Sequence, residues 1–338
     1  MTPRELGFRM PAEWEPHEAT WLAWPHEETD WPGKFEPIAW VYADFVRRVS
    51  RAERVRILVP DADRRAAAQD ALRKAGAHLA AVDFFEIPTD RSWTRDFCPI
   101  FVKRDGEVAA TDWLFNGWAK YDNWARDNAV PAAVAGRVGM RRFEAGLVLE
   151  GGSIDVNGAG ALLTTEECLL SDVQARNPGR SREEIERAFH DYLGVDRVLW
   201  LHNGIAGDDT HGHVDDLARF VSETTIVTVT EADRGDANYE PLRENLEVLR
   251  SFGGYRVVTL PMPEPVYFDG QRLPASYANF YVANEKVFVP TFNDPNDRVA
   301  LNVMADLFPD REVIGMACLD LVLGLGTLHC MTQQQPAA

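Results

Sequence analysis

The chain reads Gly324-Leu325-Gly326-Thr327-Leu328-His329-Cys330-Met331-Thr332-Gln333-Gln334-Gln335 where a glycine-rich turn leads to a cysteine. The turn follows the apolar run Leu319 to Leu323, and a strand there could present a thiol to a cleft. Cys330 is therefore a candidate nucleophile. The alternative is a buried cysteine that packs as a small apolar side chain, and this stretch alone does not decide between the two. The nucleophile is favoured by four residues elsewhere in the chain: Asp96, Glu150, His213 and Asp215.

Around this stretch, the chain repeats one pattern of strands, a helix and a closing strand. The first clear unit has a strand at 55–59, a helix at 61–75 and a strand at 82–87. Further units extend over residues 146–201, 213–260 and 278–314. They recur at intervals of roughly 60 to 70 residues, longer than the common solenoid repeats. The segment around Cys330 and the N-terminal strand and helix (19–24 and 38–51) are expected to be two parts of one more unit, which would close a ring.

Local signals support this division into units. Ser181 with Glu184 fits the capping box that opens a helix, and Asn157-Gly158 is a favoured hairpin turn. No serine-, glycine- or proline-rich tract divides the chain, and 46% of its residues are hydrophobic, enough for a large core. We therefore expect residues 1–338 to form a single catalytic domain of the α/β class, built from repeated strand-helix-strand units.

Composition narrows the class of partner. A net charge of −18 repels phosphate backbones and anionic membranes, so nucleic acid and membrane partners are not expected. The same charge favours a small cationic ligand, although an acidic surface can also serve solubility alone. The sequence contains neither a signal segment nor a long apolar run, and its four cysteines form no CxxC pair, so a reducing, cytoplasmic setting is expected. A homodimer is left open.

No cofactor is expected. Gly158-Ala159-Gly160 and Gly324-Leu325-Gly326 both lack the third glycine of the dinucleotide fingerprint, and no P-loop lysine pattern occurs. The glycines therefore do not indicate a nucleotide site.

His213 and Asp215 form the second candidate cluster. If this stretch enters a strand, alternation places the imidazole and the carboxylate on the same face. A solvated acidic loop is the plain alternative. A second alternative is a metal-dependent hydrolase that uses His211, His213 and Asp215, because His-x-His-x-Asp resembles the zinc motif of metallo-β-lactamase-like hydrolases. That family places its motif early in the chain and has a histidine soon after the aspartate, whereas Asp216 and Leu217 follow here.

The carboxylates suggest what the site binds. Buried carboxylates are costly unless a cation accompanies them, so Asp96, Glu150 and Asp215 around one cavity would suit a cationic ligand. A planar guanidinium offers N–H forks that match carboxylates, and a thiolate could approach its central carbon from one face. Trp93 offers an aromatic face to the same cation, although it could equally be a packed core residue.

Seven motifs, in this order, resemble the agmatine deiminase and Porphyromonas-type peptidylarginine deiminase family of guanidino-group-modifying enzymes. They are Met10-Pro11-Ala12-Glu13-Trp14 with Trp21 to Pro25, Asp90-Arg91-Ser92-Trp93-Thr94-Arg95-Asp96, Asn116-Gly117-Trp118, Glu150-Gly151-Gly152, Gly212-His213-Val214-Asp215, Tyr277-Ala278-Asn279-Phe280 and His329-Cys330-Met331-Thr332-Gln333-Gln334. The resemblance covers essentially the whole chain.

The resemblance implies a five-bladed α/β propeller with pseudo-fivefold symmetry, like that of the penteins. It also implies cofactor-free hydrolysis of a guanidine to a urea and ammonia, with agmatine giving N-carbamoylputrescine on a route to polyamines. Cys330 would be the nucleophile and His213 the general acid and base. Asp96 and Asp215 would hold the guanidinium, and Glu150 would lie beside His213.

Two departures from the family pattern concern the rest of the substrate. His211 stands where an aspartate is common, and Gly324-Leu325-Gly326-Thr327 replaces the usual Gly-Gly-Gly-Asn. Asp209, close to the catalytic stretch, would favour a dication, whereas His211 could itself become positive. Arginine, peptidylarginine and a silent guanidino-binding relative therefore remain alternatives to agmatine.

Overall fold

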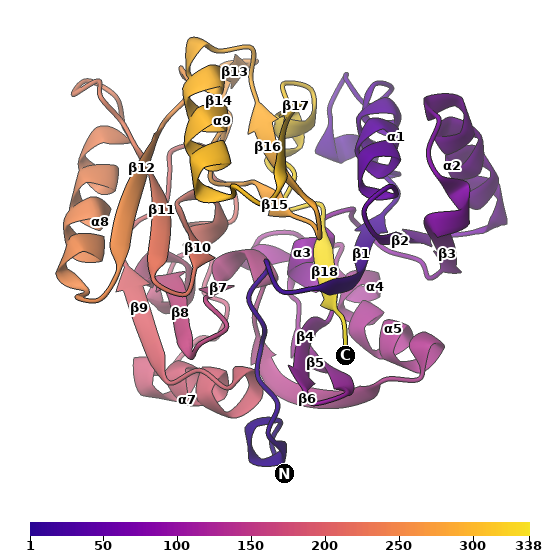
Figure 1. The fold of residues 1–338 in the computed structure, drawn as a ribbon, viewed down its shortest axis with the longest axis horizontal. Coiled ribbons are helices and arrows are strands. Elements are labelled where there is room, and N and C mark those ends of the chain that lie inside the picture. Colours follow the sequence, from indigo (N-terminus) through magenta and orange to yellow (C-terminus); the bar gives the residue numbers. More distant parts are fainter.

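The structure is a computed structural model that describes residues 1–338. Five mixed sheets have the strand orders β18-β1-β2-β3, β4-β5-β6, β7-β8-β9, β10-β11-β12 and β15-β16-β17. A small hairpin, β13-β14, stands apart from them. In Figure 1, strands β4, β7, β10, β15 and β18 lie nearest the middle of the molecule, and the long helices lie outside.

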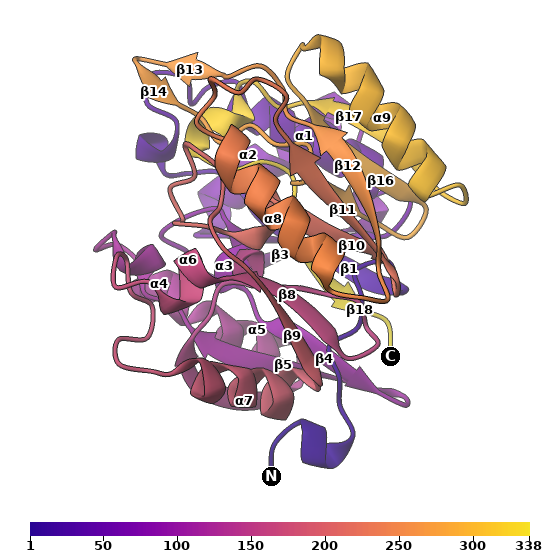
Figure 2. The same ribbon diagram turned by 90° about the vertical axis from the view of Figure 1, so that its left-hand side faces the viewer.

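The strands of the five sheets are β1 (His17–Ala23), β2 (Arg54–Val59), β3 (Val82–Glu86), β4 (Ile100–Arg104), β5 (Glu107–Leu114), β6 (Arg141–Val148), β7 (Asp155–Val156), β8 (Ala161–Thr165), β9 (Arg197–Leu201), β10 (Ala218–Ser222), β11 (Thr225–Thr230), β12 (Arg256–Pro261), β15 (Tyr281–Val282), β16 (Lys286–Thr291), β17 (Glu312–Ala317) and β18 (Gln333–Pro336). The hairpin strands are β13 (Tyr267–Phe268) and β14 (Gln271–Arg272). Figures 1 and 2 both place this hairpin at the opposite side of the molecule from the N-terminus.

The helices are α1 (Ile38–Val49), α2 (Ala62–Ala75), α3 (Thr94–Phe97), α4 (Ala125–Asn128), α5 (Val130–Val138), α6 (Glu166–Leu170), α7 (Arg182–Leu193), α8 (Tyr239–Ser251) and α9 (Pro295–Leu307). Short 3₁₀ turns are η1 (Arg4–Leu6), η2 (Glu28–Asp30), η3 (Leu79–Ala81), η4 (Gly117–Ala119), η5 (Gly151–Ser153), η6 (Val214–Asp216) and η7 (Leu321–Gly324). No helix combines the length and the hydrophobicity needed to span a bilayer.

Each of the five sheets has one antiparallel pair of strands, and the sheet of β18, β1, β2 and β3 has two parallel pairs where the others have one. An antiparallel pair is followed by a parallel strand, and a helix makes the crossover that a parallel pair requires, as α5 does between β5 and β6. Sequence signals set the helix ends. Ser181 and Glu184 form the predicted capping box of α7, and Gly194, with φ of 71°, ends it in the left-handed conformation.

The N-terminal and C-terminal segments complete one sheet, as expected. Strand β18 pairs antiparallel with β1, with Thr20 opposite Gln334. This places the turn that carries Cys330 directly before an inner strand. The sheet is the one that also holds β2 and β3, however, so the two ends complete the first unit and do not make a further one.

The unit that the sequence analysis missed is β4-β5-β6, residues 100–148. Segment 146–149 was expected to open the second unit, but residues up to Val148 are the end of β6, where Val148 lies opposite Leu114. Most side chains of β6 are exposed or half-buried, so the strand lacks an apolar pattern, and α5 has only 9 residues. The turn Asp105-Gly106 between β4 and β5 is a hairpin signal that could have revealed the unit.

Candidate active site

A cavity of about 280 Å³ opens beside Cys330. Its walls come from loops and short helical turns that connect strands of different sheets, which is why residues distant in sequence meet here. The lining residues are Thr29, Asp30, Arg91, Trp93, Asp96, Trp118, Tyr121, Asp209, Thr210, Gly324, Leu325, Gly326 and Cys330.

Cys330 lies in a turn between η7 and β18, and not on the strand that the sequence suggested. Asn279 holds this turn, because its Oδ1 accepts the backbone N–H of His329 at 3.0 Å while its Nδ2 donates to Sγ of Cys330 at 3.1 Å. Gly326 is required beside it, since a Cβ there would lie 2.9 Å from the Trp93 ring and 3.0 Å from Cβ of Cys330. The glycine-rich approach thus makes room for an aromatic wall next to the thiol.

The Cys330 thiol faces carboxylates. Its Sγ lies 3.8 Å from Oδ2 of Asp215. Burial raises the pKa of Cys330 well above its ordinary value, and the negative charges of Asp215 and Asp216 raise it further. Burial and these negative charges therefore favour a protonated thiol, and a bound cation would favour the thiolate.

Asp96, on α3, forms one wall of the site. Nε1 of Trp118 donates to its Oδ2 at 2.9 Å, and the backbone N–H of Gly152 donates to its Oδ1 at 3.1 Å. Burial raises the pKa of Asp96 to about 6, although His213 opposes this rise. Gly152 cannot carry a side chain, because a Cβ would lie 2.5 Å from Nδ1 of His213.

Asp215 faces the thiol from the other side. It lies in the turn η6 and not in a strand, so the turn, and not strand alternation, turns Asp215 and His213 toward each other. Nδ1 of His329 lies 2.7 Å from Oδ2 of Asp215, and this contact outweighs burial and lowers the pKa of Asp215. Oδ1 of Asp215 has no hydrogen-bond partner and lies 4.0 Å from Nδ1 of His213.

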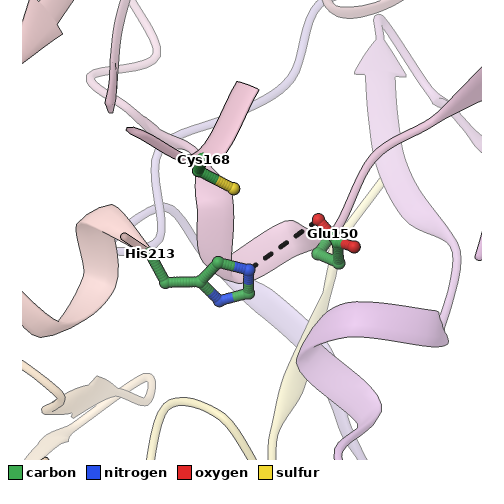
Figure 3. Close-up of side chains that lie close together, drawn as sticks. All are labelled: Glu150, Cys168 and His213. Atoms are coloured by element: carbon green, nitrogen blue, oxygen red, sulfur yellow. Dashed lines mark ion pairs between the residues drawn. The ribbon is translucent and has the colours of Figure 1, made fainter. Parts of the chain in front are cut away.

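His213 lies between three acids. Its Nδ1 is 3.8 Å from Oδ1 of Asp96 and 4.0 Å from Oδ1 of Asp215, and its Nε2 is 3.8 Å from Oε2 of Glu150 (Figure 3). Neither ring nitrogen has a hydrogen-bond partner. Burial opposes a charged imidazole, but Asp96, Cys168 and Glu150 outweigh it and hold the pKa of His213 well above its ordinary range. The residue is charged at neutral pH and can donate a proton.

Glu150 is fixed from behind. Nε of Arg176 donates to its Oε1 at 2.9 Å, and both side chains are fully buried. Burial alone would raise the pKa of Glu150, but Arg176 and His213 outweigh it and lower the pKa to about 2. Glu150 is therefore an anion that holds the imidazolium of His213 in place.

Two further predicted site residues line the cavity. Trp93 packs against Trp31 with ring centroids 5.3 Å apart and forms a wall beside the thiol. Asp209 forms an ion pair with Lys120 and accepts a hydrogen bond from the Tyr121 hydroxyl at 2.7 Å. Its charge is neutralised, which weakens the steering role expected for it.

His211 does not reach the cavity. Its Nε2 lies 3.2 Å from Oγ of Ser171, and its Nδ1 lies 3.8 Å from Oε1 of Glu167. The backbone explains this direction, because His211 has φ of 65° and Gly212 has φ of 95°, so the chain reverses between His211 and His213. The zinc set of His211, His213 and Asp215 is therefore not assembled, and a place for His211 beside the substrate is not supported.

Several residues of the site were missed by the sequence analysis. Asp216 is buried and accepts from Nδ2 of Asn279 at 2.9 Å, and His329 contacts Asp215. Trp118 donates to Asp96. Trp118, Asn279 and His329 stand within motifs that carry the family resemblance, so those motifs were the available signal.

The outer part of the cavity contains one cation. Arg91 pairs with Asp30, donates to Oδ1 of Asn123 at 2.9 Å and lies over the Tyr121 ring at 4.4 Å. Burial raises the pKa of Asp30 to about 6, although Arg91 opposes this rise. Oδ2 of Asp30 has no partner.

Known proteins are similar to this chain in sequence and in fold. The family model of the Porphyromonas-type peptidyl-arginine deiminases matches residues 9–336. The agmatine deiminase of Pseudomonas aeruginosa (strain UCBPP-PA14) is 37% identical over 99% of this chain and 97% of the relative.

Solved structures agree over the whole chain. A structure of the agmatine deiminase of Enterococcus faecalis superimposes with a TM-score of 0.92 at 32% identity, covering 99% of this chain and 97% of the other. A putative arginine deiminase from Porphyromonas gingivalis gives 0.88 at 38% identity, covering 97% and 98%. With a family match over nearly every residue and full-length relatives above 30% identity, the chain belongs to the Porphyromonas-type peptidyl-arginine deiminase family.

Proposed function

We propose that the protein hydrolyses the guanidino group of agmatine to N-carbamoylputrescine and ammonia, through a covalent intermediate on Cys330. One observation carries the proposal: the buried Cys330 thiol lines a cavity together with Asp96 and lies 3.8 Å from Oδ2 of Asp215. Burial and the neighbouring carboxylates raise the pKa values of Asp96 and Cys330, so a cationic ligand would stabilise the ionised forms of both groups.

A guanidinium fits between Asp96 and Asp215. Oδ1 of Asp215 is free, and both carboxylates can accept N–H donors in the plane of the ligand. Trp93 would cover one side. The ligand's charge stabilises the thiolate of Cys330, so binding releases the thiol proton to solvent and prepares the nucleophile only when substrate is present.

His213 then moves two protons. The thiolate attacks the guanidinium carbon, and the C–S bond forms while the imidazolium protonates the departing nitrogen, which leaves as ammonia. The neutral imidazole next accepts a proton from water as the oxygen adds to the amidino-thioether carbon. Collapse of that adduct breaks the C–S bond, returns the thiolate and releases the ureido product as the hydroxyl proton passes to solvent. Glu150 keeps the imidazole oriented throughout.

The lining of the cavity supports agmatine over arginine. An α-carboxylate would need a cationic partner, and Arg91 is the only cationic residue in the lining. Arg91 already pairs with Asp30 and Asn123. An amine tail would instead meet Asp30, whose Oδ2 is unpartnered. Relatives named for agmatine and for arginine both exist, so the lining residues carry this choice.

We extend the proposal to the architecture. Four of the sheets place three strands in chain order, the sheet of β18, β1, β2 and β3 has one strand more, and the inner strands β4, β7, β10, β15 and β18 lie nearest the middle of the molecule in Figure 1. This arrangement supports a five-bladed pseudo-fivefold propeller acting as one catalytic domain over residues 1–338. All four cysteines are free, which is compatible with the expected reducing compartment. The cytoplasmic location and a homodimer stay predictions.

A ureido assay across agmatine, arginine, a peptidylarginine and guanidinobutyrate tests activity and substrate class together. We expect the highest kcat/KM with agmatine, and full activity after treatment with a chelator. Cys330→Ser should bind agmatine but lose turnover by about 10³-fold or more. Binding without turnover by the wild-type protein would favour a silent relative, and activity that a chelator abolishes and zinc restores would favour the metallohydrolase alternative.

A further inference from the structure

A second cysteine lies behind the catalytic histidine. Glu150, Cys168 and His213 each offer one ligand atom, and these atoms all lie within 4.8 Å of one another (Figure 3). Cys168 comes from α6, which Thr165 caps by accepting the Cys168 backbone N–H at 3.1 Å. The Cys168 thiol therefore belongs to the capped first turn of α6.

Two of the three ligand atoms are unoccupied. Nε2 of His213 and Oε2 of Glu150 face each other at 3.8 Å, too far apart for a hydrogen bond, and neither atom has a hydrogen-bond partner, although the side chains are only 1% and 0% exposed. Arg176 takes Oε1 of Glu150 and leaves Oε2 turned toward the imidazole. Buried polar atoms without partners are uncommon and costly, so their convergence on one point indicates a place for an additional ligand.

The donor set selects the ligand. A thiolate, an imidazole and a carboxylate are the three side-chain donors that bind Zn²⁺, and a water can complete the tetrahedron. The thiolate and the carboxylate balance the charge of a dication. We propose that Glu150, Cys168 and His213 form a zinc site that is separate from the substrate position.

A rival set contains Asp215, Asp216 and Cys330. Its atoms are already engaged, since Nδ2 of Asn279 donates both to Sγ of Cys330 and to Oδ1 of Asp216. His329 occupies Oδ2 of Asp215. The set around Cys168 is therefore the better zinc site, although both adjoin the catalytic centre.

Zinc at this site would switch the enzyme off, a consequence that rests on the proposed function. The metal takes the Nε2 lone pair of His213, so the imidazole can neither carry the proton to the departing ammonia nor accept one from water. Inhibition would be reversed by a chelator, the opposite of what a zinc-dependent hydrolase shows.

Cobalt(II) is the spectroscopic probe for the full-length protein, because a thiolate ligand gives a charge-transfer band in the near ultraviolet. We expect wild type and Cys330→Ala to bind one cobalt each with this band, and zinc to displace it. Cys168→Ala should lose the band. Cys98→Ala is the matched control, since Cys98 is an equally buried free thiol that belongs to neither ligand set.

A variant with Cys98→Ala, Cys318→Ala and Cys330→Ala retains Cys168 alone and keeps the test decisive if Cys168→Ala does not fold. Its cobalt band can arise only from Cys168. The proposal is overturned if this variant shows no thiolate band, if the band depends on Cys330, or if wild type binds no metal. These readouts do not require turnover, so they separate a missing zinc site from a wrong assignment of the reaction.

Discussion

Nδ1 of His329 lies 2.7 Å from Oδ2 of Asp215. His329 directly precedes Cys330, the candidate nucleophile. Its other nitrogen, Nε2, lies 2.8 Å from Oε2 of Glu13, which Arg219 also holds at 2.8 Å. Each ring nitrogen of His329 therefore faces one carboxylate oxygen. These contacts fix the direction of the Asp215 carboxylate and make His329 a positioning residue.

His329→Gln should loosen this clamp. A glutamine amide can donate to one carboxylate but cannot span both, so Asp215 loses its fixed direction. We expect kcat/KM for agmatine to fall by about 100-fold, the order expected for a displacement of about 1 Å at a reacting group. Because Asp215 binds the ground state, KM should rise more than kcat falls. If the His329→Gln variant folds like the wild-type protein and keeps the wild-type KM for agmatine, His329 does not position Asp215.

The titration of Cys330 gives a second prediction. Burial and the charge of Asp215 raise its pKa, so the free protein should react slowly with iodoacetamide at neutral pH and faster as pH rises. Asp215→Asn removes one negative charge and should lower the pKa, which increases alkylation of Cys330 at pH 7. Asp209→Asn is the control, because Lys120 already neutralises that carboxylate. Alkylation is read by mass spectrometry of the Cys330 peptide, and equal rates in all three proteins would refute the electrostatic account.

The ionised carboxyl group of Asp96 should lower the free energy of unfolding at neutral pH. Its folded pKa of about 6 lies above the ordinary 3.8, so the folded state is favoured below pH 3.8 and loses stability as pH rises through 6. This rise in the pKa of Asp96 corresponds to about 3 kcal/mol of stability. The gain in Asp96→Asn should be smaller, because the variant weakens the hydrogen bonds from Trp118 and Gly152. Asp96→Asn should therefore be inactive but more stable than wild type by about 1–3 kcal/mol at pH 7.5.

Urea unfolding at pH 7.5 and pH 4 measures this effect. The difference between Asp96→Asn and wild type should shrink at the lower pH, where the wild-type carboxyl group takes up a proton. Asp83→Asn, at a half-exposed surface pair with Arg54, should show no such dependence. A destabilised Asp96→Asn at pH 7.5 would mean that the hydrogen bonds from Trp118 and Gly152 outweigh the burial of charge.

The sequence predicted the site better than it predicted the sheets around it. The structure brings together the five predicted residues Cys330, Asp96, Glu150, His213 and Asp215. Glycines next to them in the sequence were part of the signal, because a Cβ at Gly152 or Gly326 would collide with side chains of the site. Strand β6 could not be predicted in this way, since its exposed side chains show no period-2 apolar pattern.

The direction of His211 could not be read from the sequence either. It stands two residues from His213, and alternation in a strand would have placed both on one face. The positive φ of His211 and Gly212 reverses the chain, and such a reversal at a non-glycine residue has no reliable sequence signal.

Substrate choice should depend on Asp30 and not on His211. Asp30 neutralises Arg91 within the cavity lining, so Asp30→Asn would leave an unpaired guanidinium there. An unpaired guanidinium repels the agmatine ammonium and offers a partner to an α-carboxylate. We expect kcat/KM for arginine relative to agmatine to rise by about tenfold or more, which is the effect of roughly 1.4 kcal/mol.

His211→Asp is the matched control and should leave the ratio within about twofold, because the side chain at this position faces Ser171 and Glu167. If His211→Asp shifts the ratio and Asp30→Asn does not, the substrate tail lies on the other side of the cavity.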